Sequence, residues 1–125
     1  MSKTKILFVD DNNLNRMVME EMIDIIFPEI TIESYESASE VLNLPLEEYI
    51  MILSDISMPD IDGFTLYDRL RTQKNYQKPI IAVTALAVGG DKERMLMHGF
   101  SDFISKPIDM NELENTLSKY ILKED

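Results

Sequence analysis

Five polar side chains stand at or just after the ends of apolar runs in this sequence. They are Asp10, Asp11, Asp55, Thr84 and Lys106. Brought together, they would form a site of three carboxylates with one hydroxyl and one ammonium group beside them. The chemistry of such a site depends first on the repulsion between three carboxylates at close range.

Carboxylates held a few Å apart repel one another, and each raises the pKa of the others. A hard divalent cation relieves this repulsion, and Mg²⁺ suits the site because it binds carboxylates and keeps several of its waters. A carboxylate beside Mg²⁺ can attack phosphorus and become an aspartyl phosphate. The Lys106 ammonium and the Thr84 hydroxyl could then bind the phosphoryl oxygens. These residue types therefore predict Mg²⁺-dependent phosphoryl transfer to a carboxylate.

Composition and charge exclude several kinds of protein. The chain has 125 residues and no Gly- or Ser-rich linker, so we expect a single domain over residues 1–125. It has no cysteine, which excludes disulfides and thiolate metal sites. A net charge of −11 disfavours nucleic acid, whose binding depends on Lys and Arg. With no signal peptide and no stretch that could span a bilayer, we expect a cytoplasmic protein without membrane contact.

The hydrophobic pattern predicts five strands. Unbroken apolar runs at 5–9, 49–53 and 80–83 are typical of strands that are covered on both faces of a parallel sheet. The runs at 31–35 and 102–105 contain more polar residues and are expected at the two edges. Three inner strands between two edge strands make one five-stranded sheet.

Helical patterns separate the predicted strands. They cover Asn13–Ile26, 37–44, Gly63–Thr72, Asp91–His98 and 109–122. The first helix gathers its apolar residues on one face, where we expect it to pack on the sheet. These residues are Leu14, Met17, Val18, Met22, Ile25 and Ile26. The last helix starts with Asp109 and Glu112 at the spacing of a capping box.

The alternation of strands and helices predicts an α/β fold, a (βα)5 three-layer sandwich with helices on both faces of a parallel sheet. With the more polar strands outside, the expected strand order is 2-1-3-4-5, the flavodoxin-like winding. Its reversal point lies between strands 1 and 3, and open α/β sheets bind ligands at the carboxyl ends of the strands beside that point. The five polar side chains are therefore expected in one site.

Four segments resemble the successive signatures of one family, the receiver domain of two-component response regulators. They are FVDDNNLNR, LSDISMPDIDG, IIAVTALA and DFISKPID. The resemblance covers residues 6–121, and it is specific because the signatures occur together and in order. It implies that Asp55 is the phosphoacceptor and also a metal ligand. Asp10, Asp11 and the Ser57 backbone carbonyl would complete the protein's ligands to Mg²⁺.

The same resemblance implies roles for other residues of the site. Thr84 matches the switch hydroxyl of the family, and Lys106 matches the lysine that stabilises the phosphoryl group. A cis peptide bond is implied between Lys106 and Pro107. Phe103 matches the switch aromatic, which is tyrosine in many members. A phenylalanine has no hydroxyl, so the hydrogen-bonded latch of the tyrosine type is not expected here.

Two further positions border the path of the water that hydrolyses the aspartyl phosphate in this family. They are occupied here by Ser57 and Leu86. Ser57 is short and could admit or hydrogen-bond a water, whereas Leu86 has no polar group and could cover the opening. Because the positioning of the attacking water supplies much of the catalysis, Leu86 predicts slow self-dephosphorylation.

The resemblance implies a signalling role rather than an enzyme that turns over an external substrate. The phosphoryl donor would be a histidine kinase or a histidine phosphotransfer protein. Phosphorylation would change the surface of the fourth helix, fifth strand and fifth helix, where a downstream protein binds, and a weak homodimer is compatible with this. The segments DDNNLNR and FISKPIDMNEL look most like receivers of hybrid histidine kinases or phosphorelays.

Two other functions are compatible with the same residues. A Mg²⁺-dependent phosphatase-like hydrolase would also use a strand-end aspartate, but it needs a second carboxylate two residues later, where this chain has Ser57. A non-phosphorylated interaction module would keep the fold without the reaction, and the complete set of site residues argues against it. Plainer explanations exist for single residues, since an Asp-Asp pair also favours a helix N-terminus.

Overall fold

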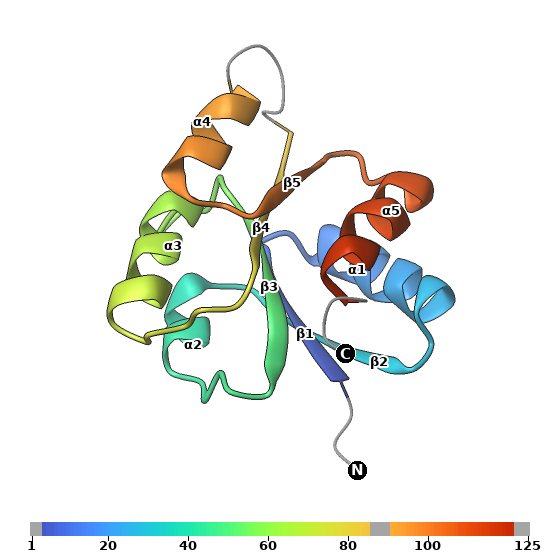
Figure 1. The fold of residues 1–125 in the computed structure, drawn as a ribbon, viewed down its shortest axis with the longest axis horizontal. Coiled ribbons are helices and arrows are strands. Elements are labelled where there is room, and N and C mark those ends of the chain that lie inside the picture. Colours follow the sequence, from blue (N-terminus) through green and yellow to red (C-terminus); the bar gives the residue numbers. More distant parts are fainter. Residues whose placement is uncertain (1–3, 86–90, 122–125) are drawn as a thin grey trace.

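A computed structural model describes residues 4–85 and 91–121, and its strands form one five-stranded sheet (Figure 1). The strands are β1 (Thr4–Val9), β2 (Ile30–Tyr35), β3 (Tyr49–Asp55), β4 (Ile80–Thr84) and β5 (Asp102–Ser105). Their order across the sheet is β2-β1-β3-β4-β5, and all neighbouring pairs are parallel. The predicted flavodoxin-like winding is therefore confirmed.

Helices cover both faces of the sheet. They are α1 (Asn13–Ile26), α2 (Ala38–Leu42), α3 (Gly63–Thr72), α4 (Asp91–His98) and α5 (Met110–Ile121). α1 and α5 lie on one face, and α2, α3 and α4 lie on the other, which gives the three predicted layers (Figure 1). Within the described ranges, no helix is long and apolar enough to cross a membrane.

Two helices start one residue later than predicted because a polar side chain caps each start. The Ser37 hydroxyl accepts a hydrogen bond of 3.3 Å from the Glu40 amide, so α2 begins after Ser37. The Asp109 carboxylate accepts one of 2.9 Å from the Glu112 amide, so α5 begins after Asp109. Capping residues have a non-helical backbone, which excludes both from their helices.

The central strands bury side chains on both faces, which explains their unbroken apolar runs. On β1, Leu7 and Val9 join the core beneath α2, α3 and α4, whereas Ile6 and Phe8 join the core beneath α1 and α5. All four are fully buried, and each such side chain contributes roughly 1.5–3 kcal/mol. This burial holds β1 in the middle of the sheet and fixes the position of its carboxyl end.

The apolar face predicted for α1 is only partly the buried one. Met19 and Ile23 are fully buried, whereas Leu14, Met17 and Ile25 are 65%, 54% and 68% exposed. The helix has two apolar stripes side by side, and spacing alone does not distinguish the stripe that meets the sheet. Three large apolar side chains are therefore left on the surface of α1.

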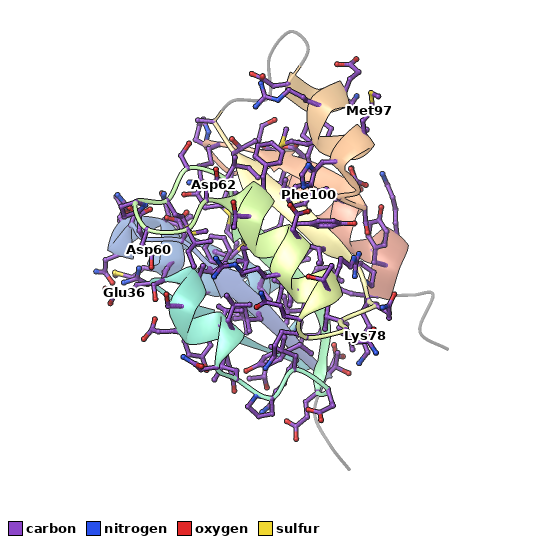
Figure 2. The ribbon with its side chains drawn as sticks, turned by 90° about the vertical axis from the view of Figure 1, so that its left-hand side faces the viewer. Glu36, Asp60, Asp62, Lys78, Met97 and Phe100 are labelled. Carbon is purple, nitrogen blue, oxygen red and sulfur yellow. The ribbon has the colours of Figure 1, made fainter. Side chains whose placement is uncertain are left out.

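Aromatic side chains join α4 to α3 on the opposite face of the molecule. Phe100 lies between the two helices (Figure 2), with its ring centroid 4.9 Å from that of Tyr67 and 5.9 Å from that of Phe64. His98 ends α4, and its Nε2 atom lies 2.9 Å from a carboxylate oxygen of Asp68 on α3. α4 is therefore attached to α3 as well as to β5.

Candidate functional site

The carboxyl ends of β1, β3, β4 and β5 bring the predicted side chains to one edge of the sheet. A pocket of about 280 Å³ opens there. Its lining residues are Asp10, Asp11, Asn12, Asn15, Asp55, Ser57, Thr84, Ala85 and Lys106. The five side chains singled out by the sequence thus share one pocket, and Ser57 lines it with them.

Asp55 reaches the pocket because β3 continues two residues beyond its apolar run. Its backbone pairs with Val83 of β4, and the residue is only 5% exposed. The chain then folds back, and the Gly63 amide donates a hydrogen bond of 2.9 Å to the Ile56 carbonyl. A Cβ atom at Gly63 would lie 2.6 Å from the Asp55 carbonyl oxygen, so the close approach of α3 to β3 requires glycine.

Three carboxylates form the acidic part of the pocket. One oxygen from each of Asp10, Asp11 and Asp55 lies within 4.8 Å of the others. Asp10 is fully buried and Asp55 nearly so, whereas Asp11 is exposed to solvent. Oxygen ligands at this spacing fit Mg²⁺, and the open side at Asp11 leaves room for the waters that this ion keeps.

Lys106 lies between two of these carboxylates. Its Nζ atom is 2.9 Å from Asp10 Oδ2 and 3.2 Å from Asp55 Oδ1. Its backbone amide donates a hydrogen bond of 3.0 Å to the Thr84 carbonyl, and its peptide bond to Pro107 is cis. The ammonium group is thus within reach of any group attached to Asp55.

The pKa values of the two central groups are both shifted. Burial raises the pKa of the Asp55 carboxyl, and the Asp10 carboxylate raises it further, although Lys106 acts in the opposite direction. Burial alone would lower the pKa of Lys106, but its contacts with Asp10 and Asp55 outweigh burial and raise it. The protonated form of Asp55 is therefore favoured more than in an exposed aspartate, and a bound cation would oppose that preference.

Two asparagines outside the predicted set of site residues also line the pocket. The Asn12 amide donates a hydrogen bond of 2.8 Å to Asp10 Oδ1, and Asn15 Nδ2 donates one of 3.3 Å to Asp10 Oδ2. The Asn12 side chain also caps α1 by accepting a bond of 3.0 Å from the Asn15 amide. An asparagine just before a helical pattern is a known capping signal, so Asn12 could have been found from the sequence.

The remaining predicted residues lie around the pocket in different ways. Thr84 is buried at the end of β4 and lines the pocket. Phe103 of β5 is half-buried and does not line it, and the Lys92 ammonium lies 5.1 Å from its ring centroid. Leu86, the predicted cover over the water path, lies outside the described residues.

Comparison with known proteins identifies the family of this chain. Residues 6–118 match the family model described as the response regulator receiver domain. The chain belongs to this family. It is 33% identical over 120 residues to the signal transduction histidine-protein kinase BarA of Escherichia coli K12, with 92% of this chain and 12% of BarA covered. It is 32% identical over 124 residues to the osmosensing histidine protein kinase SLN1 of Saccharomyces cerevisiae, with 95% of this chain and 10% of SLN1 covered.

A solved receiver domain is also similar in sequence and fold. The receiver domain of the sensor histidine kinase PA1611 from Pseudomonas aeruginosa PAO1 has 31% sequence identity and a TM-score of 0.82, with 96% of this chain and 98% of that chain covered. That crystal structure contains a magnesium ion coordinated in its active site cleft. This chain is thus a receiver domain of two-component signal transduction, and its acidic cluster has the residue types for a metal ion.

Proposed function

We propose that this receiver domain accepts a phosphoryl group on Asp55 from a phosphohistidine of a partner protein, with Mg²⁺ bound at the acidic cluster. One observation carries the proposal: oxygens of Asp10, Asp11 and Asp55 lie within 4.8 Å of one another while Lys106 contacts two of these residues. Such a site can hold a cation, and it places a lysine beside the buried carboxylate that would react.

Each residue has a chemical task in this reaction. A carboxylate oxygen of Asp55 attacks phosphorus, so that a new O–P bond forms as the P–N bond to the donor histidine breaks. Mg²⁺, when bound by the three carboxylates and the Ser57 carbonyl, supplies charge neutralisation for the phosphoryl oxygens. The Lys106 ammonium binds one of these oxygens, and the Thr84 hydroxyl donates a hydrogen bond to another.

The phosphoryl donor must approach this pocket, which the start of α1 lines. Asn12 and Asn15 line the pocket at the start of the helix, and Leu14, Met17 and Ile25 continue along its surface. An exposed apolar stripe beside a reaction site favours an apolar helix face on the partner. We therefore place the histidine-containing donor on α1, with its apolar side on this stripe.

The downstream partner would bind at a second surface, formed by α4, β5 and α5. Thr84 ends β4 beside Asp55, and Phe103 lies on the neighbouring strand β5. Leu96, Met97 and Met110 present apolar surface on α4 and α5, at 40%, 87% and 37% exposure. A change at Thr84 on phosphorylation would reach this surface through β5.

The chain as a whole would act in the cytoplasm as one switchable domain over residues 1–125, without turning over an external substrate. Its surface charge disfavours nucleic acid, because the chain has 23 acidic and 12 basic residues. The signal that it receives and the protein that it regulates would be set by the partners on its two surfaces.

Labelling with acetyl phosphate tests this function without a known kinase. Intact-mass spectrometry should show one added phosphoryl group with Mg²⁺ and almost none after the metal is chelated. Asp55→Asn should remain unlabelled. The control Asp60→Asn should label like the parent, because Asp60 lies between β3 and α3 (Figure 2) and does not line the pocket. Full labelling of Asp55→Asn would contradict the assignment, and a parent that is never labelled would favour the interaction module.

A further inference from the structure

We propose that Arg16 is a positioning residue for the Mg²⁺ site, a role that rests on the proposed function. Arg16 lies near the start of α1 and does not line the pocket. Its Nη1 atom donates a hydrogen bond of 2.7 Å to the Asp10 carbonyl oxygen, and its Nη2 atom donates one of 3.2 Å to Asn13 Oδ1. The guanidinium group thus ties the backbone of the metal-binding turn to the helix that follows it.

The Asp10 carbonyl lies just where the sheet stops holding the chain. β1 has ended one residue earlier, although the Asp10 amide still donates a bond of 3.0 Å to the Tyr35 carbonyl. The Asp10 carboxylate is held by Asn12, Asn15 and Lys106. The carbonyl oxygen is held instead by the guanidinium, so the side chain and the backbone of Asp10 have separate partners.

A positive charge at this place is opposed by two electrostatic effects. The N-terminal end of a helix already carries partial positive charge, and a cation held by Asp10 and Asp11 would be repelled by a guanidinium group. An arginine nevertheless suits the position, because its rigid fork of donors binds two acceptors at once. Geometry and charge therefore predict opposite effects of removing the Arg16 side chain, and the two can be distinguished by experiment.

The geometric role makes a definite prediction for metal affinity. Without Arg16 the turn would lose one of the bonds that keep Asp10 and Asp11 in the arrangement in which their oxygens lie within 4.8 Å of one from Asp55. Loss of a partner that orients metal ligands commonly weakens metal binding by about tenfold or more. Asp55, Lys106 and Thr84 stay in place, so labelling by acetyl phosphate at saturating Mg²⁺ should be largely kept.

Calorimetric titration of Mg²⁺ into the unphosphorylated protein measures this effect. Arg16→Met should weaken Mg²⁺ binding about tenfold. Arg16→Lys keeps the charge but has a single donor group, so its Mg²⁺ affinity should lie between those of Arg16→Met and the parent. Arg71→Met is the matched control, because Arg71 Nη1 donates bonds of 2.7 Å to the Tyr76 and Lys78 carbonyls, away from the pocket. It should lower the unfolding temperature and leave the Mg²⁺ affinity unchanged.

Amide hydrogen exchange of residues 10–13 in metal-free protein gives a second measure. Exchange should be faster in Arg16→Met than in the parent, and unchanged in Arg71→Met. Equal exchange rates, or a Mg²⁺ affinity equal to or tighter than that of the parent, would overturn the positioning role. Should Arg16→Met fail to fold, the same two measurements on Arg16→Lys decide. A parent protein that binds no Mg²⁺ would contradict the proposed function itself, whatever the variants show.

Discussion

At the scale of single residues, Asp55 combines a nucleophilic oxygen with surroundings that oppose its charge. The residue is almost completely buried, and the nearby Asp10 carboxylate adds repulsion that Lys106 only partly offsets. The same surroundings that raise its pKa favour a bound cation. The Asp55 carboxylate would thus be both a metal ligand and the nucleophile.

Replacement of Asp55 by asparagine should therefore stabilise the metal-free protein at neutral pH, by on the order of 1 kcal/mol, because it removes a buried charge and its repulsion from Asp10, which together outweigh the lost contact with Lys106. The pKa of Asp55 is raised in the folded state relative to the unfolded state. The parent therefore loses stability as the pH rises from the unfolded-state pKa to the folded-state pKa. The difference should be small near about pH 3, where the carboxyl is mostly protonated in both the folded and the unfolded state, and larger at neutral pH. Urea unfolding at both pH values measures it, and an Asp55→Asn protein that is less stable than the parent at neutral pH would contradict it.

The sequence allowed the charged residues of the pocket to be predicted, but not the contacts that orient them. Asp10, Asp55 and Lys106 stand at strand ends, where topology alone brings them together. The bond from Arg16 to the Asp10 carbonyl depends on the conformation of a turn. No residue pattern specifies that conformation, because many turns are compatible with the same residues.

At the scale of elements, α3 packs against the end of β3 with no room for a side chain. A Cβ atom at Gly63 would lie 2.6 Å from the Asp55 carbonyl oxygen and 2.8 Å from Ile56 Cα. Both contacts are with backbone, which cannot move aside as the end of a flexible side chain can. The position of Asp55 therefore depends on the start of α3.

Gly63→Ala should destabilise the protein by roughly 1–3 kcal/mol, as overpacking commonly does, and slow its labelling by acetyl phosphate. Thr65→Ala, at an exposed position in the same helix, is the control and should change stability by no more than about 0.5 kcal/mol. Chemical unfolding and a labelling time course check both. Unchanged stability and rate in Gly63→Ala would show that α3 does not constrain Asp55.

The exposed stripe of α1 is expected to control how fast a protein donor transfers its phosphoryl group. Leu14→Gln and Met17→Gln should slow phosphoryl transfer from a phosphorylated histidine phosphotransfer protein by about tenfold, if these side chains anchor the partner. Labelling by acetyl phosphate should be unchanged, because that small donor needs no docking surface. Met97→Gln, on the exposed face of α4, is the control and should transfer at the parent rate. Equal slowing with both donors would contradict the docking role.

Element order and type could be predicted well from the sequence, whereas the orientation of α1 could not. The strands and the winding follow from unbroken apolar runs between helical patterns, because burial on both faces demands them. In α1, Met19 and Ile23 meet the core while Leu14 and Met17 do not. A helix with apolar residues on two adjoining stripes can be rotated either way without breaking its pattern.

At the scale of the whole molecule, the acidic pocket lies between two proposed protein-binding surfaces on a strongly acidic domain. The pocket is lined by the start of α1 and by residues at the carboxyl ends of the strands. α1 and α4 lie on opposite faces of the sheet (Figure 1). The chain carries a formal net charge of −11. Partners that approach such a domain are expected to be proteins rather than nucleic acids.

The isolated chain should therefore show no binding to double-stranded DNA at physiological salt, because its net charge of −11 opposes the approach of phosphate groups. A gel-shift titration checks this, with a basic DNA-binding protein as the positive control. Phosphorylation adds negative charge and should not create binding. A specific shift at physiological salt, with or without acetyl phosphate, would contradict the expectation.

The central claim, that Asp55 carries the phosphoryl group, is tested most directly by chemical trapping. Borohydride reduces an aspartyl phosphate to homoserine, and trypsin would leave Asp55 in a peptide of residues 17–69, separate from Asp10 and Asp11 in a peptide of residues 6–16. After treatment with acetyl phosphate, Mg²⁺ and borohydride, fragmentation of the peptides should place homoserine at position 55. Homoserine at position 10 or 11, or at another position of the longer peptide, would contradict the account.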